Sequence, residues 1–88
     1  MTYVLALAPR ARRAIETDLP EAAAAAVLEF ITGPLLANPH RVGKALGGQL
    51  AGKYVARRGE YRVLYRVEET TATVRVVRID HRRDAYRW

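Results

Sequence analysis

Residues 61–67 constrain the fold more than any other segment of the sequence, because their side chains alternate strictly. Tyrosine or valine occupies every second position, and the positions between are arginine, leucine and arginine. Side chains at alternate positions of a β-strand share one face. The pattern therefore predicts a strand that buries Tyr61, Val63 and Tyr65 and places Arg62 on the opposite face of a sheet.

Three further segments have the composition of β-strands: residues 2–8, 53–57 and 73–80. In the second of these, alternation gives Lys53, Val55 and Arg57 a common face. If this face is also the one that bears Arg62, a cluster of cations lies on a sheet surface. The chain has too few helices to cover that surface as well, so we expect the charged face to be open to a ligand.

The first half of the chain favours two helices. One covers about residues 9–17. The other starts at Asp18 or Pro20 and ends at the Gly33-Pro34 pair, since glycine caps a helix and proline cannot continue it.

The order of one strand, two helices and three strands predicts an α+β fold. We expect a small antiparallel sheet, a β-meander, with the two N-terminal helices packed on one face. Residues 35–50 have little pattern and are expected to form a connection. With 88 residues in all, the chain is expected to be a single domain over residues 1–88.

Composition excludes several classes of protein. The sequence has no cysteine, which rules out disulfides and cysteine-ligated zinc, and only two histidines. No apolar run approaches the roughly 20 residues of a membrane span, and the N-terminus lacks a charged leader. We therefore expect a small cytoplasmic protein that requires neither a metal nor another cofactor.

The net charge of +6 is unevenly placed along the chain. Residues 1–44 carry five cations and four acids, a net of +1, whereas residues 45–88 carry ten cations and five acids, a net of +5. All but two of the cations are arginine, whose planar fork binds phosphate and stacks on bases. An arginine-rich proteome accounts for part of the number of arginines but not for their excess in residues 45–88. A polyanionic partner is therefore expected.

Three stretches share a recognisable pattern: Asn-Pro-His-Arg-Val-Gly-Lys-Ala-Leu at 38–46, Ala-Arg-Arg-Gly-Glu-Tyr-Arg-Val-Leu-Tyr at 56–65, and Ile-Asp-His-Arg-Arg-Asp-Ala-Tyr at 79–86. The pattern resembles the RelE/ParE superfamily of bacterial type II toxins, particularly its RelE-like branch in actinobacteria. This resemblance implies an mRNA interferase, a ribosome-dependent endoribonuclease that cuts mRNA in the A site without a metal. It also implies a cognate RelB-like antitoxin with an acidic helical segment.

The resemblance further implies which residues form the site. Lys53 matches a lysine assigned to proton transfer or charge stabilisation, Arg62 a phosphate-binding arginine, and Tyr86 a tyrosine that stacks on or orients the nucleotide. We take Arg82 as the second catalytic cation. The candidates for binding substrate phosphate are Lys44, Arg57, Arg58 and His81.

Two positions depart from the pattern of the best-studied members. Val55 stands where they have a second lysine, and Asp80 where an arginine is expected. Arg57 is a candidate to replace the missing charge. An ion pair with Glu60 or Glu68 is the competing interpretation of Arg62.

Two other functions are compatible with the same pattern. A ParE-type toxin of this fold poisons DNA gyrase by binding and cuts no RNA. A non-catalytic RNA- or ribosome-binding module would need only the basic second half of the chain.

Overall fold

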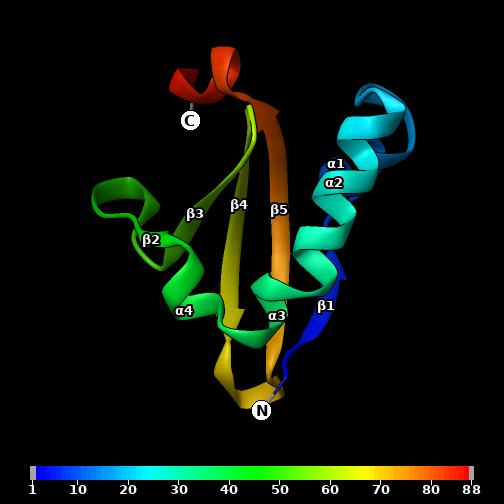
Figure 1. The fold of residues 1–88 in the computed structure, drawn as a ribbon. Coiled ribbons are helices and arrows are strands. Elements are labelled where there is room, and N and C mark those ends of the chain that lie inside the picture. The colour runs from blue at the N-terminus through cyan, green and yellow to red at the C-terminus, as the bar shows by residue number, and fades with distance from the viewer. Residues whose placement is uncertain (1, 88) are drawn as a thin grey trace.

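A computed structural model of the chain describes the backbone of residues 2–87 and the side chains of residues 2–84. Five strands form one sheet in the order β1-β5-β4-β3-β2 (Figure 1). Their bounds are β1 Val4–Leu7, β2 Lys44–Ala45, β3 Lys53–Arg58, β4 Tyr61–Glu68 and β5 Thr73–His81. The α+β prediction is confirmed, and the three predicted C-terminal strands are the centre of this sheet.

The sequence had suggested an antiparallel sheet, but one strand pair of the structure is parallel. Neighbouring strands from β2 to β5 are antiparallel, but β1 pairs in parallel with β5, in a register that runs from Val4 opposite Thr73 to Leu7 opposite Val76. No hairpin joins these two strands. Their relative direction is therefore set by the path of the chain through the helices and the other strands.

Within the described residues, the α-helices all lie in the first half of the chain. The helical elements are α1 Pro9–Arg13, a π-helical turn η1 Ala14–Asp18, α2 Glu21–Thr32, α3 Pro34–Ala37 and α4 Pro39–Val42. Three single-turn or short 3₁₀ helices follow: η2 Gly48–Leu50, η3 Glu69–Thr71 and η4 Arg82–Arg87. Across the described residues, no helix has the length and apolar character that crossing a membrane requires.

The region expected to be a connection with little pattern, residues 35–50, contains most of α3, all of α4, the strand β2 and the 3₁₀ helix η2. Pro34 and Pro39 each occupy the first helical position of α3 and α4, where the missing amide hydrogen costs nothing. The Gly33-Pro34 pair thus ends α2, as predicted, and also begins the next helix.

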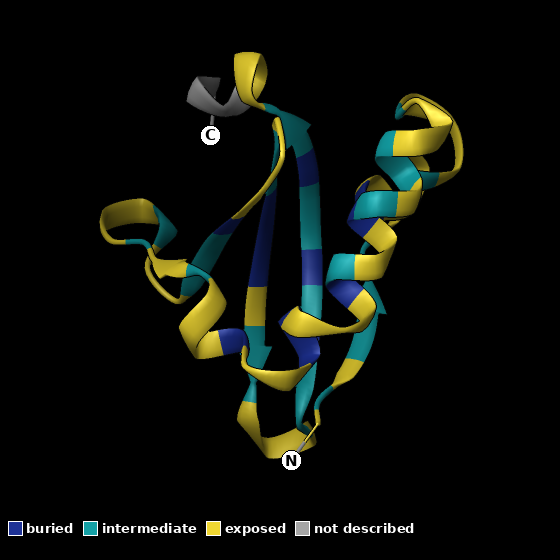
Figure 2. Ribbon diagram, viewed as in Figure 1, coloured by how far each residue is buried: buried dark blue, intermediate teal, exposed yellow. Residues whose placement is uncertain are grey.

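All the helices that contribute to the core pack on one face of the sheet (Figure 2). The buried core residues are Ala11, Ala14, Val27, Ile31, Leu35, Leu36, Ala56, Val63, Tyr65, Val74, Val76 and Ile79. Tyr61 is partly buried against this cluster. The predicted inward face of residues 61–67 is confirmed, and Arg62 is on the other face, which we call the open face.

A β-bulge in β5 allows apolar side chains from both halves of that strand to face the core. Tyr65 pairs with Val76 whereas Leu64 pairs with Arg78, so Val77 is the extra residue. Without it, Val76 and Ile79 would face opposite sides of the sheet. The bulge therefore buries both of them and turns Arg78 to the open face.

Tyr65 fixes the segment that leads into β2. Its hydroxyl, deep in the core, donates a hydrogen bond of 2.6 Å to the carbonyl oxygen of Pro39, and burial raises the pKa of Tyr65 to about 12. A Cβ at Gly43 would overlap this hydroxyl, so only glycine lets the chain pass so close. This contact holds α4 and the segment just before β2 against Tyr65 of β4.

Candidate nucleic-acid interface

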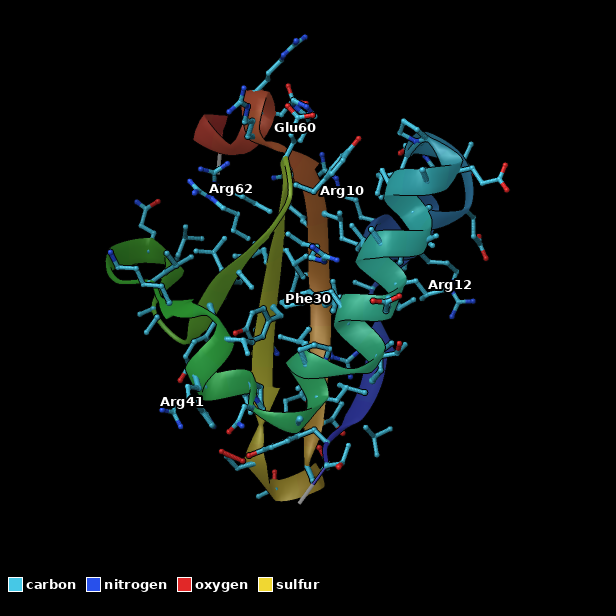
Figure 3. All side chains as sticks on the ribbon, viewed as in Figure 1. Arg10, Arg12, Phe30, Arg41, Glu60 and Arg62 are labelled. Atoms are coloured by element: carbon cyan, nitrogen blue, oxygen red, sulfur yellow. The ribbon has the colours of Figure 1, made fainter. Side chains whose placement is uncertain are left out.

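The centre of the candidate site is a pair of arginines on adjacent strands. Arg57 of β3 is directly opposite Arg62 of β4, and residues paired in this way share one face of a sheet. The open-face cluster predicted by alternation is therefore confirmed at this pair. In Figure 3, Arg62 lies at the end of the sheet nearest the C-terminal helix.

Two more arginines complete a pocket of about 370 Å³ at this end of the sheet. Arg57, Arg62, Arg82 and Arg83 line it. The latter two follow directly after β5, at the start of η4. All four lining residues are arginine, while the carboxylate of Glu60 lies beside Arg82 and Asp80 pairs with Arg62 across the sheet.

Glu60 positions the start of η4. Its carbonyl oxygen accepts a hydrogen bond of 2.7 Å from the backbone N–H of Arg82, and its carboxylate Oε1 lies 3.8 Å from Arg82 Nε. Gly59 supplies the positive φ of 60° that the tight β3–β4 turn requires. The turn and the C-terminal segment are thus joined, which places Arg82 over the ends of β3 and β4.

The ion-pair interpretation of Arg62 is not supported by the structure. Glu68 is 3.6 Å from Arg66 and 3.1 Å from Arg75, and the carboxylate of Glu60 is near Arg82 and His81. Among residues 2–84, neither Arg57 nor Arg62 has an ion pair. Two adjacent guanidinium groups without a carboxylate partner are a favourable site for phosphate.

The open face continues along the strands toward Lys53. Lys53 pairs with Arg66, four residues from Arg57 along β3, which corresponds to about 13 Å of strand. Val55 and Leu64 pair with each other between these two rows. Lys53 therefore shares the face of Arg62, as predicted, but does not line the arginine pocket.

Comparison with known proteins gives the family of the chain. A family model described as the ParE toxin of the type II toxin–antitoxin system matches residues 6–86. Toxin RelG of Mycobacterium tuberculosis is 47% identical over 87 residues, which are 99% of each chain. The chain belongs to the RelE/ParE superfamily of type II toxins. Toxin RelE of the same organism is 45% identical over 85 residues, covering 97% of this chain and 87% of the relative.

A solved structure supports the membership of the RelE/ParE superfamily. The crystal structure of the RelBE2 toxin–antitoxin complex from Mycobacterium tuberculosis contains a chain that is 44% identical to this one. The two superpose with a TM-score of 0.88 over 92% of this chain and 99% of that one. The resemblance inferred from sequence motifs is therefore confirmed, and so is the RelE-like toxin fold.

The structure does not bring every predicted site residue into the arginine pocket of this RelE-like chain. Arg58 is opposite Tyr61 on the helix-covered face, where it lines a different pocket beside α2. His81 packs edge-on against the Tyr61 ring at 5.3 Å, and its Nδ1 accepts a hydrogen bond from the Arg83 amide. Tyr86 lies outside the residues whose side chains are described.

Arg83 is the one pocket residue that sequence reasoning did not select. The signal was present, because Arg83 is adjacent to Arg82 in an Arg-Arg pair. In an extended strand these two side chains would point to opposite faces, but the chain turns into η4 at this point. The turn allows both arginines to line the same pocket.

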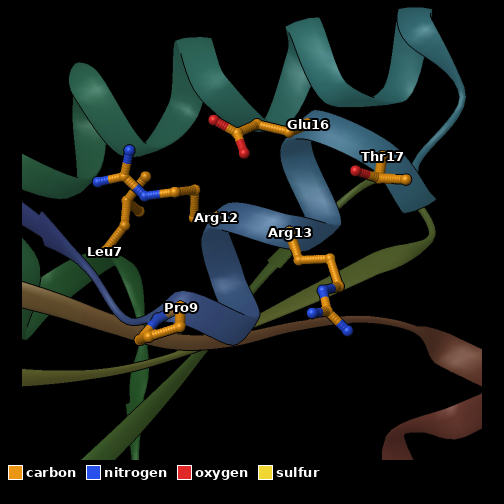
Figure 4. A pocket seen from close by; sticks show the side chains of 6 residues that line it. All are labelled: Leu7, Pro9, Arg12, Arg13, Glu16 and Thr17. Atoms are coloured by element: carbon orange, nitrogen blue, oxygen red, sulfur yellow. The ribbon is translucent and has the colours of Figure 1, made fainter.

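Another pocket that contains arginine lies on α1 and differs from the arginine pocket in charge and geometry. It has a volume of about 390 Å³ and is lined by Leu7, Pro9, Arg12, Arg13, Glu16 and Thr17. Arg12 and Arg13 leave the helix in different directions (Figure 4), and Glu16 supplies a negative charge. It is therefore less suited to hold a phosphate than the pocket at Arg62. The described part of the chain contains no cluster of three or more metal-ligating side chains.

Proposed function

We propose that this toxin is an endoribonuclease that cuts mRNA in the A site of the translating ribosome. The observation that supports it is the pocket of four arginines on the open face of the sheet. A pocket of this charge suits a phosphodiester, and its position on an uncovered face leaves room for a polymer. The relatives named RelG and RelE favour this function over that of a gyrase poison.

The reaction is attack of a ribose 2′-oxygen on the adjacent phosphorus, with cleavage of the P–O5′ bond. The products are a 2′,3′-cyclic phosphate and a free 5′-hydroxyl. Charge accumulates on the non-bridging oxygens in the transition state, and fixed cations lower its energy. Arg62 and Arg57 would hold these oxygens, and Arg82 would stabilise the same charge from the side of η4.

Two further residues of the site have roles in the reaction, and of these only Lys53 is a candidate for proton transfer. We assign Lys53 to proton transfer or charge stabilisation and Tyr86 to stacking on or orienting the nucleotide. Because Lys53 is one row beyond Val55 on the open face, its ammonium group would approach the nucleotide from the side opposite Arg82. His81 adjoins Arg82 in the sequence, but its ring packs against Tyr61 on the helix-covered face and so does not point at the phosphate held in the arginine pocket.

The same surface explains how the toxin would be controlled. The structure of RelBE2 is that of a toxin–antitoxin complex. We propose that a RelB-like antitoxin binds this chain and that its acidic helical segment covers the arginine pocket. Such a segment would compete directly with RNA phosphate for the guanidinium groups.

The proposal is tested with the purified chain in a reconstituted translation reaction containing one defined mRNA. Primer extension maps new 5′ ends on ribosome-bound and on free mRNA. We expect a discrete cut in the A-site codon on ribosomes only. The Arg62→Ala variant should cut about 10²- to 10³-fold more slowly, the usual effect of removing one group that stabilises transition-state charge.

Arg13→Ala is the matched control, because it removes an exposed arginine from α1 and leaves the open face intact. It should cut at the wild-type rate. Inhibition of translation without a cut would instead favour the non-catalytic binding module. DNA damage with intact translation would identify a ParE-type toxin, the toxin that the matching family description names.

A further inference from the structure

On β3, the two cations of the open face are separated by one uncharged residue of that face. Lys53 and Arg57 are four residues apart on this strand, and the residue between them on the same face is Val55. A phosphate placed over Val55 would find no cation on β3 itself. The neighbouring strand β2 supplies one, because Lys44 pairs directly with Val55.

Lys44 is therefore on the open face, beside Val55. In an antiparallel pair the diagonal neighbours of a residue lie about 7–8 Å away, within reach of long side chains. The diagonal neighbours of Lys44 on β3 are Lys53 and Arg57. Lys44 is exposed and has no ion pair within residues 2–84, so its ammonium group is available to a ligand.

The position of Lys44 is set by contacts on both sides of it. The backbone N–H of Leu46 donates a hydrogen bond of 2.9 Å to the carbonyl oxygen of Lys53, which extends the pairing of β2 with β3. On the other side, Gly43 is in contact with the hydroxyl of the buried Tyr65. A two-residue edge strand anchored at both ends suits a fixed binding position.

We propose that Lys44 binds the phosphodiester next to the one held by Arg57 and Arg62, and so forms a second phosphate subsite on the open face. This inference rests on the proposed RNA substrate and gives the direction in which the RNA crosses the open face. The RNA strand would run from the arginine pocket across Val55 toward the β2 edge. Lys44 would then be a substrate-binding residue that contributes to affinity and not to the chemical step.

Binding is tested with a short 2′-O-methylated single-stranded oligoribonucleotide, which cannot be cleaved by 2′-oxygen attack. Its affinity for wild type and for Lys44→Gln is measured over a series of salt concentrations. Each phosphate contact on single-stranded nucleic acid contributes about 0.7 to the slope of log affinity against log salt. We expect the variant to lose about this amount, while Lys44→Arg retains the wild-type slope.

Arg41→Gln is the matched control for loss of one charge. Arg41 is exposed and only three residues from Lys44, but it belongs to α4 and not to the sheet. Its removal should leave the slope unchanged. Equal slopes for Lys44→Gln and wild type, or equal losses for Lys44→Gln and Arg41→Gln, would overturn the subsite.

The cleavage assay separates this inference from the proposed function. In ribosome-bound cleavage, Lys44→Gln should raise KM and leave kcat unchanged, the pattern of a residue that binds ground state and transition state equally. A fall in kcat with constant KM would contradict the assignment. If wild type does not cut at all, the proposed function fails, whereas the salt slopes still decide whether Lys44 contacts phosphate.

Discussion

Arg57 of β3 and Arg62 of β4 are directly opposite each other across the strand pair, with no acidic side chain lining the pocket that they share. Like charges in this arrangement repel, and the repulsion lowers the stability of the folded state. The chain nevertheless places both at the end of the sheet where Arg82 and Arg83 add further positive charge. The arrangement favours binding of an anion over stability of the free protein.

Removal of one of these charges should stabilise the fold and weaken the activity. For Arg57→Gln we expect an increase of about 0.2–1 kcal/mol in the free energy of unfolding, the usual range for a cross-strand charge pair. Urea denaturation at low salt measures it, and the gain should shrink at high salt because exposed charges are screened. Cleavage by the same variant should be slower than wild type.

Arg58→Gln is the control for this effect. Arg58 is adjacent to Arg57 in sequence but pairs with Tyr61, so its removal relieves no cross-strand repulsion. We expect its unfolding midpoint and cleavage rate to match those of the wild type. An Arg57→Gln variant that is less stable than wild type would contradict the prediction. It would show that packing of the aliphatic part of Arg57 stabilises the fold by more than repulsion from Arg62 destabilises it.

Glu69 should make stability depend on acid pH. Its carboxylate accepts a hydrogen bond of 2.6 Å from the Tyr3 hydroxyl and bonds His40 Nε2 at 2.6 Å, and these contacts lower the pKa of Glu69 from 4.5. Because the pKa is lower in the folded state, the contribution is complete above pH 4.5 and is lost as pH falls through the folded-state value. Unfolding followed as a function of pH measures this loss.

Glu69→Gln should remove that part of the acid sensitivity. The difference in stability between wild type and the variant is expected to shrink as pH falls from 4.5 through the folded-state pKa of Glu69. Glu29→Gln is the control, since Glu29 is an exposed residue of α2 with no side-chain partner within the described residues. A difference that does not change with pH would rule out this titration as its origin.

The face of each central strand could be predicted from the sequence, because burial on one side of a sheet imposes a local period of two. The same rule would have excluded Arg58 from the open face, since Arg58 is two residues from the buried Ala56 and therefore shares its face. The bulge at Val77 could not be predicted in this way. Its position depends on how β5 pairs with β4. Because residues 76 and 77 are both valine, the sequence does not show which of them faces the core.

The candidate site was predictable only where it depends on alternation. Arg57 and Arg62 share a face by parity, but their direct pairing required the register of β3 and β4. The relation between Lys44 and Val55 had no sequence signal, because a strand of two residues is too short to show a period. Arg83 was missed because its orientation depends on the turn into η4.

The Tyr65 hydroxyl should contribute measurably to stability. In Tyr65→Phe the carbonyl oxygen of Pro39 loses its 2.6 Å hydrogen bond in a buried position, which costs about 1–3 kcal/mol. Urea denaturation measures the loss. Tyr61→Phe is the control, since the Tyr61 hydroxyl has no hydrogen bond within the part of the chain whose side chains are described, and it should unfold at the wild-type midpoint.

Gly43 should be intolerant of any side chain, because a Cβ there would overlap the hydroxyl and the ring of Tyr65. The tyrosine is fully buried and hydrogen-bonded, so it cannot move aside cheaply. We expect Gly43→Ala to lower the free energy of unfolding by about 1–3 kcal/mol, the usual cost of overpacking a core. Gly47→Ala is the control: its Cβ would meet nothing within 4 Å, and its φ of −116° suits any residue. Equal unfolding midpoints for the two variants would show that α4 and β2 can shift away from Tyr65.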